Sequence, residues 1–195
     1  MKKFELTREF ITFLGRKLFR IKALVEFGDV KAGELGGYVE KEENINHEGN
    51  AWVYGNARVY GDARVYGDAR VSGDARVSGD ARVYGNARVY GNARVSGDAW
   101  VYGNARVYGD ALVVKQEDII FTAAKFGTIF RTTTAYRTTD GVQINCGCFS
   151  GNLEEFREQI TQTREGRMRE KYLHHADEIE MYFDLDLEKE EKEGE

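Results

Sequence analysis

The sequence is poor in several residue types that mark common protein classes. It has no proline, two cysteines and three histidines among its 195 residues. No apolar run approaches the roughly 18 residues that a membrane-spanning helix needs. The first residues also lack the charged, apolar and cleavage-site order of a secretion signal. We therefore expect a cytoplasmic protein with no membrane partner, in which Cys146 and Cys148 stay reduced.

The charge of the chain does not point to a nucleic-acid partner. The formal net charge is -5, and acidic residues gather near the C-terminus. Residues 49–114 carry eight arginines against six aspartates. Proteins that bind nucleic acid usually concentrate basic residues on one surface. We therefore expect no nucleic-acid partner, and we expect the acidic run 185–195 to be a solvated tail.

What the chain does have is a short repeat. From Gly49 to Val114 a six-residue unit recurs eleven times without a break, from GNAWVY to GDALVV. Self-similarity at a fixed short period indicates a solenoid, because one unit cannot bury a core alone. Within a unit, residues such as Ala51 and Val53 alternate with Trp52 and Tyr54, which is the period of a strand with one face inward.

Gly-Asn or Gly-Asp then supplies a corner after each strand, because both residues tolerate the positive φ of a sharp turn. Three corners close a triangular coil, and strands of successive coils pair in parallel about 4.8 Å apart. The lack of proline agrees with this arrangement, since the ladder uses each backbone N–H.

The pattern V-[YS]-G-[DN]-A-R resembles that of the hexapeptide-repeat, left-handed β-helix superfamily, which has an aliphatic residue and a small one two positions before it. Val53 to Val113 match the first role at every sixth position, and Ala51 to Ala111 match the second. Here Tyr or Ser follows the aliphatic residue and Gly comes one later. That variant is similar to uncharacterised bacterial and phage-encoded repeat proteins, as are the flanks GELGGYVEKEENI and INCGCFSGNLEEF.

This resemblance implies a mainly β fold with a left-handed parallel β-helix, inside a bacterium or a phage-infected cell. The left hand comes from the resemblance alone, since parallel crossovers are normally right-handed. We expect an N-terminal β cap over residues 1–24, the β-helix over 25–114, a small α+β domain over 115–184 and the tail.

The cap is expected to contain strands at Phe10 to Phe13 and Lys17 to Ala23 around a Leu14-Gly15 turn. Residues 25–48 read as imperfect coils, which solenoids need because a regular end coil would expose its edge. Their inward residues are predicted to be Leu35, Val39 and Ile45, with a bend at Gly36-Gly37.

The C-terminal domain is expected to begin with a hairpin. Its strands are Thr128 to Tyr136 and Val142 to Phe149, joined by an Asp140-Gly141 turn of type I′. A helix follows with Asn152 and Glu155 as its capping pair, and a second helix starts near Met168.

Because each coil uses three repeats, every third repeat shares a column, and three outward faces can be written down. The third face has Asp62, Asp80 and Asp98 at its corner, and beside them two columns: Arg64, Arg82 and Trp100, and Tyr66, Tyr84 and Tyr102. Aligned aromatic residues are typical of interfaces. We interpret these two columns as an interface for a homo-oligomer or a protein partner. Alternatively, each arginine pairs with the aspartate two before it and lies over the tyrosine two after it, and the faces are only solvated ladders.

The superfamily resemblance also implies acyltransferases with a histidine base and loops between coils. The repeat block has neither, and His47 just before it is the one candidate. His174 and His175 diverge by about 100° on a helix. Cys146 and Cys148 share one face of a strand, so we expect both in the core. We therefore predict no catalytic residue, no metal and no cofactor, and an acyltransferase is the weakest alternative.

A last candidate site lies in the C-terminal domain. A strand and the following helix start supply polar groups that suit an anion, because free N–H groups at a helix start favour negative charge. The residues are Arg131, Thr132, Thr133, Thr134, Arg137, Ser150, Gly151 and Asn152. The alternative is an ordinary hairpin followed by an ordinary N-cap.

Two functions therefore stand beside the acyltransferase. The first is a non-enzymatic β-helical scaffold that oligomerises or binds a partner. The second is a phage-type counter-defence protein that sequesters a nucleotide signal or blocks a host complex. It depends on the flank resemblance and on a phosphate-bearing ligand at the candidate anion site.

Overall fold

The computed structural model describes residues 1–124 and 131–185, which fall into two compact units with their boundary after Gln116. Both units are built around β-sheets, and the second also has two helices. Within the described part of the chain, no helix combines the length and apolar character that crossing a bilayer requires.

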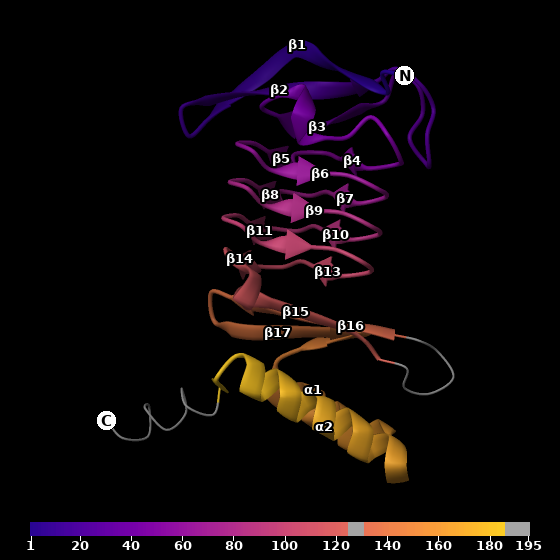
Figure 1. The fold of residues 1–195 in the computed structure, drawn as a ribbon, viewed down its shortest axis with the longest axis vertical. Helices are drawn as coiled ribbons and strands as arrows, with labels where there is room; N and C mark the ends of the chain where they lie inside the picture. The colour runs from indigo at the N-terminus through magenta and orange to yellow at the C-terminus, as the bar shows by residue number, and fades with distance from the viewer. Residues whose placement is uncertain (125–130, 186–195) are drawn as a thin grey trace. The chain divides into compact units, whose positions relative to one another are not determined.

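The first unit is a parallel β-solenoid, which confirms the predicted architecture. Its short strands recur once in every repeat and stack in Figure 1 as successive coils. They are β4 (Trp52–Val53), β5 (Arg58–Val59), β6 (Arg64–Val65), β7 (Arg70–Val71), β8 (Arg76–Val77), β9 (Arg82–Val83), β10 (Arg88–Val89), β11 (Arg94–Val95), β12 (Trp100–Val101), β13 (Arg106–Val107) and β14 (Leu112–Val113). The left hand of the coil stays a prediction.

Three sheets form the sides of the solenoid. The first face contains β4, β7, β10 and β13, the second contains β5, β8, β11 and β14, and the third contains β6, β9 and β12. Every strand pairs in register with the strand three repeats away, so that Arg88 lies between Arg70 and Arg106. The inward alanines and valines, from Ala51 to Val113, are at most 1% exposed.

Only the glycine of each corner takes the positive φ that the sequence suggested for both corner residues. Gly79 has φ 65°, and a Cβ there would lie 2.9 Å from the backbone nitrogen of Gly97 in the next coil. The following residue uses its N–H across the coils, as Asp80 does to the carbonyl of Gly97 at 2.8 Å. The glycine therefore serves both the turn and the close stacking of coils.

The N-terminal segment caps the solenoid. Strands β1 (Phe4–Phe13) and β2 (Arg16–Ala23) form an antiparallel hairpin around Leu14 and Gly15, which have φ of 49° and 75°. Strand β3 (Leu35–Val39) pairs with β2 and, in parallel, with β5, so the cap extends the second-face sheet. Figure 1 shows these strands at the N-terminal end of the coils.

Two predictions about residues 25–48 are wrong. Leu35 is 48% exposed, because the pairing of β2 with β3 is irregular next to it, whereas Val39 and Ile45 are buried as expected. Gly36 and Gly37 lie inside β3 and form no bend. They are glycine because the backbone passes close to the next coil: a Cβ on Gly36 would be 2.6 Å from the carbonyl oxygen of Val53.

Trp52 also differs from its repeat equivalents. The alternation of the repeat predicts that it points outward with Tyr54, but it is completely buried. The rings of Phe4 and Phe27 contact it edge-on, at 6.0 and 5.4 Å between centroids. The cap therefore covers the first coil of the first face.

Side chains replace a missing strand at the N-terminal edge of the coils. Inside the solenoid, a backbone N–H donates to a carbonyl of the next coil, as Arg64 does to Ala81 at 2.9 Å. Among the residues that the structure describes, no strand lies above β4 or β6 to serve the first coil, and only an isolated parallel bridge joins Ile45 to Val65 of β6. Instead Lys3 Nζ donates to the carbonyls of Gly49 and Ala51 at 3.2 and 3.0 Å.

Asn44 does the same for the third face. It ends the 3-10 helix η1 (Glu42–Asn44), and its Nδ2 donates to the carbonyls of Gly61 and Ala63 at 3.1 and 2.9 Å. These are the same repeat positions that Lys3 serves on the first face. One ammonium and one amide thus serve these edge carbonyls on two of the three sheets.

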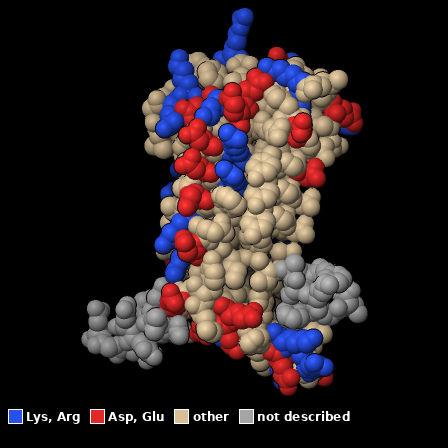
Figure 2. Space-filling view, in the orientation of Figure 1, with Lys and Arg blue, Asp and Glu red and all other residues tan. Residues whose placement is uncertain are grey.

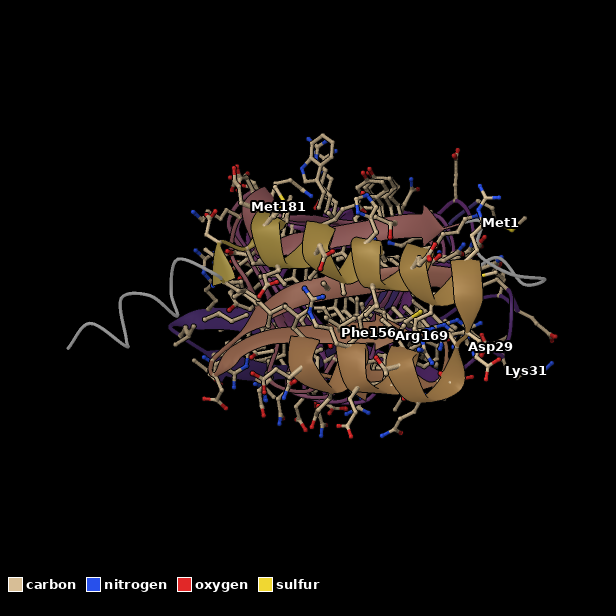
Figure 3. The ribbon with its side chains drawn as sticks, turned by 90° about the horizontal axis from the view of Figure 1, so that it is seen from below. Met1, Asp29, Lys31, Phe156, Arg169 and Met181 are labelled. Atoms are coloured by element: carbon tan, nitrogen blue, oxygen red, sulfur yellow. The ribbon has the colours of Figure 1, made fainter. Side chains whose placement is uncertain are left out.

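The second unit is an antiparallel sheet with two helices. Its strands are ordered β15 (Ile119–Ala124), β16 (Arg131–Thr138), β17 (Gly141–Cys146) and β18 (Phe149–Gly151), after the 3-10 helix η2 (Gln116–Asp118). Helices α1 (Leu153–Thr163) and α2 (Gly166–Tyr182) pack on residues such as Ala135 and Ile144. In Figure 3, Phe156 lies on the side of α1 that faces α2.

The hairpin of this unit was predicted only approximately. Thr138 pairs with Gly141, so the connecting residues are Thr139 and Asp140, and neither has the positive φ of a type I′ turn. The second strand does not run through to Phe149, because Gly147 turns the chain at φ 65° and β18 folds back on β17. Residues 128–130 of the expected first strand and 186–195 of the expected tail lie outside the described residues.

The first prediction concerns Asn44. Replacing it with alanine leaves the carbonyls of Gly61 and Ala63 without their donor, and a buried polar group without a partner costs about 1–3 kcal/mol. We expect Asn44→Ala to lower the free energy of unfolding in urea by at least that amount. Asn56→Ala, at an exposed corner, is the matched control. Equal losses in both variants would contradict the capping role.

A second prediction follows from Lys3, whose pKa burial lowers from 10.5 to about 8. Between these two values the unfolded chain binds more protons than the folded one, so rising pH favours the folded state. The stability of the wild type relative to Lys3→Met should therefore increase from pH 8 to pH 10.5 and be constant below pH 8. Urea unfolding at several pH values measures this difference, and a flat difference would contradict the burial of the ammonium.

Candidate functional site

The third face carries a continuous stack of tyrosine rings, which we call the tyrosine strip: Tyr66, Tyr84 and Tyr102. Their ring centroids are 4.8 and 5.2 Å apart, and adjacent planes differ by 2° and 10°. The in-register pairing of β6, β9 and β12 sets this spacing. Partial burial raises the pKa of Tyr84, and its two neighbours add to the rise, so the central ring stays neutral.

A second column lies beside the tyrosine strip. The guanidinium of Arg82 lies 5.1 Å from the ring centroid of Trp100, within the range of a cation–π contact. Trp100 is 42% exposed and Tyr102 is 36% exposed. Figure 2 shows this face, with acidic side chains along one edge, basic ones beside them and an uncharged strip next. The structure thus places all six predicted interface residues on one face.

The face is not flat at its N-terminal end. Residues Glu42 to His47 form one wall of an open groove of about 750 Å³ beside Arg64, Tyr66 and Arg82. The groove contains both signs of charge, and Asp62 at the neighbouring corner pairs with Lys41 at 2.6 Å. The predicted strip therefore runs from a hollow at one end to exposed aromatic rings at the other.

The arginines do not form the predicted pairs with aspartate. In the four repeats that contain both residues, no described ion pair joins an arginine to the aspartate two positions before it. Arg70 instead bonds Asp29 at 2.7 Å. Arg58 and Arg76 lie 4.6 and 5.0 Å from the ring of Phe13, rather than over a tyrosine of their own repeat. These arginines therefore have partners in the N-terminal segment, where the sequence predicts partners within the repeats.

His47, the one candidate base near the block, is engaged on both nitrogens. Its Nδ1 accepts from the backbone N–H of Lys3 at 3.1 Å, so in the neutral ring the proton is on Nε2, 2.6 Å from the carboxylate of Glu42. The ring also stacks on Phe4 at 4.5 Å. Hydrogen bonds from Lys2 and then His47 lower the pKa of Glu42. These contacts join the cap to η1.

The residues of the candidate anion site do not converge on one point. Thr133 and Arg137 share the helix-facing side of β16 with Ala135, whereas Thr132 and Thr134 alternate to the other side. The guanidinium of Arg137 donates to the carbonyl of Phe183 at 2.9 Å. Arg131 begins β16, and its side chain lies outside the described residues.

The helix start in this candidate site already has a negative group. Asn152 caps α1 by accepting from the N–H of Glu155, and the carboxylate of Glu155 accepts from the N–H of Asn152, both at 2.9 Å. Ser150 accepts from Gln143 at 2.9 Å, and Gly151 lies in β18. The predicted capping pair is therefore confirmed, and it supplies the negative charge that a helix start attracts.

Sequence reasoning missed one hydrogen-bonded chain in the second unit. Thr122 Oγ1 lies 2.8 Å from Nε2 of His175, whose Nδ1 lies 3.0 Å from the carboxylate of Glu178. His175 is 3% exposed, while the side chain of His174 points to solvent. The only available signal was the helical spacing of His175 with the buried Tyr172 and Ile179. In the described part of the chain, no cluster of three or more His, Cys, Asp or Glu side chains is arranged for a metal ion.

The comparison with known protein families agrees with the solenoid. The family model described as the YdcK beta solenoid repeat matches residues 51–67, 63–79, 75–89, 81–97, 87–103 and 99–114. These matches cover the repeat block, and the chain is therefore a β-solenoid repeat protein. No curated protein sequence matches the chain.

The two thiols allow a direct test of the second unit. Cys146 is buried in the core, but Cys148 follows the Gly147 turn and is exposed, so the prediction that both are buried is wrong. We expect a maleimide to modify Cys148 in the native protein and Cys146 only after unfolding. Intact-mass spectrometry of wild type and Cys148→Ser measures this. A native Cys148→Ser that gains an adduct at the same rate would contradict the assignment.

Proposed function

We propose that this protein is a non-enzymatic β-solenoid scaffold that forms a homo-oligomer through its third face. The observation that supports this proposal is the continuous tyrosine strip with Trp100 exposed beside it. Tyrosine, tryptophan and arginine are the residues that most often dominate binding energy at protein interfaces. The third face combines all three in two adjacent columns.

The rigidity of the strip favours association. Rings already stacked at 4.8 and 5.2 Å lose little further freedom when a partner covers them. The aspartates of the corner column and Arg64 then lie around the aromatic centre, which is the usual arrangement of a polar rim. Ordering costs, which often cancel much of the gain from buried area, are therefore small here.

A second copy of the chain suits the third face because the two ends of this face differ: Arg64 lies at one end and Trp100 at the other. A two-fold interface is self-complementary, so a feature on one copy must meet a matching feature on the other. The coil of Tyr84 lies midway between those of Tyr66 and Tyr102. Antiparallel packing about that coil brings Trp100 of one copy over Arg64 of the other. This contact would repeat the Arg82–Trp100 contact within each chain.

The two alternatives have less support. An acyltransferase needs an available histidine base, and both ring nitrogens of His47 are engaged. Capture of a nucleotide signal at the β16 site needs converging donors, whereas Arg137 and Asn152 already have intramolecular partners. A different protein partner on the third face is an outcome that the following experiment also detects.

The proposal predicts that Tyr84→Ala combined with Trp100→Ala dissociates the oligomer without unfolding it. Light scattering after gel filtration measures the mass, and circular dichroism measures the fold. The matched control is Tyr90→Ala with Tyr108→Ala, which removes an equally close ring stack, at 4.7 Å, from the first face. We expect the control to keep the wild-type mass.

Two results would contradict the proposal. One is a double variant of the third face that keeps both the wild-type mass and a native spectrum. The other is a wild-type protein that is monomeric at every concentration tested. In the second case, capture of a different protein partner by the wild type, lost in the double variant, would keep the third face as an interface and reject self-association.

A further inference from the structure

The aromatic column of the first face is interrupted at one position. Its outward residues are Tyr54, Ser72, Tyr90 and Tyr108, in successive coils of the same sheet. Tyr90 and Tyr108 stack at 4.7 Å, as the rings of the third face do. Ser72 stands where the next ring of the stack would be. The third face has a tyrosine in each equivalent coil and therefore no gap.

The missing ring leaves a slot of defined height. Successive coils are about 4.8 Å apart, so Tyr54 and Tyr90 are separated by two steps, or about 9.6 Å. A planar ring at the level of Ser72 would lie about 4.8 Å from each tyrosine. That value is within the roughly 4.5–7 Å range of stacked aromatic pairs. The slot has the height for one ring.

The slot opens into a hollow of about 360 Å³, and three of the four charged residues in its lining are arginines. Tyr54, Ser72 and Tyr90 form its aromatic side, and the rest of the lining is Asp29, Arg70, Arg88 and Arg106. Asp29 closes the N-terminal end: it accepts from Tyr54 at 3.1 Å and from Arg70 at 2.7 Å. Burial raises the pKa of Tyr54 to about 12, so this ring stays neutral.

The contacts of Asp29 do not include Arg88. Arg88 is exposed and forms no ion pair with any residue that the structure describes. It pairs in register with Arg70 and Arg106, so like charges are stacked along the hollow. The residue two before Arg88 is Asn86, where the third face has an aspartate beside Arg64 and Arg82. A bound anion would relieve this repulsion.

We propose that the slot binds a planar aromatic ring that carries an oxyanion. The ring takes the place of the missing tyrosine at the level of Ser72, between Tyr54 and Tyr90. The oxyanion lies beside it on Arg88, whose fork of N–H groups matches a phosphate or carboxylate. Two sources share this chemistry, namely a nucleotide and an aromatic acid or ester.

Isothermal titration calorimetry with phenyl phosphate and with AMP tests the proposal. Ser72→Tyr fills the slot and completes the ring stack, and Arg88→Gln removes the cation. Arg94→Gln is the matched control, because Arg94 is also exposed and also has an asparagine two residues before it, but lies on the second face. Two further titrations test each half of the ligand separately: inorganic phosphate supplies the oxyanion without the ring, and benzyl alcohol supplies the ring without the oxyanion.

We expect the wild type and Arg94→Gln to bind at least one ring-bearing phosphate. Ser72→Tyr and Arg88→Gln should each raise the Kd of this ring-bearing phosphate at least tenfold. Inorganic phosphate and benzyl alcohol should each bind the wild type at least tenfold more weakly than the ring-bearing phosphate does. Tighter binding of AMP indicates the nucleotide source, and tighter binding of phenyl phosphate indicates the aromatic ester.

Three results would overturn the slot: no binding of either ring-bearing phosphate, binding that Ser72→Tyr leaves unchanged, or inorganic phosphate binding as tightly as phenyl phosphate. Thermal melting of Ser72→Tyr shows whether the variant is folded. The site lies on a different face from the proposed interface, so light scattering on the same samples separates failure of one proposal from failure of the other.

Discussion

In-register pairing of each strand with the strand three repeats away is the interaction on which the first unit depends. It places valine on valine and alanine on alanine, so the inward columns are fully buried. Outside, the same hydrogen bonds place identical or related side chains one above another. A single different residue therefore interrupts the stack of its whole column, as Ser72 does among the tyrosines of the first face.

The same pairing brings like charges together, and it leaves backbone groups of the first and last coils without a strand to pair with. Arginines stacked along each face would repel one another in water. The N-terminal segment supplies much of the compensation: Asp29 pairs with Arg70, and Phe13 lies over Arg58 and Arg76. At the edges, side chains take over backbone hydrogen bonds. Gln116 accepts from the N–H of Trp100 at 3.1 Å at the opposite end from Lys3 and Asn44.

What could be predicted from the sequence follows its period. The strands, the corners, the three faces and the tyrosine strip all come from one short repeat taken three at a time, and the structure confirms them. The errors lie where contacts come from outside the period. Trp52 is buried by Phe4, and Asp62 pairs with Lys41 rather than Arg64. Such contacts join residues that no local pattern relates. Cys148 was misplaced for a different reason, a glycine turn inside an expected strand.

The register of the coils also limits how such a chain can change in length. An insertion or deletion of one whole coil, that is, three repeats, returns every later side chain to its own column, so the faces grow or shrink with their chemistry intact. A change of a single repeat keeps the inward alternation but moves all later residues round by one face. The tyrosines of the third face would then continue a column of another face. The column in which a residue stands is thus kept when whole coils are inserted or deleted, and it is lost when a single repeat is.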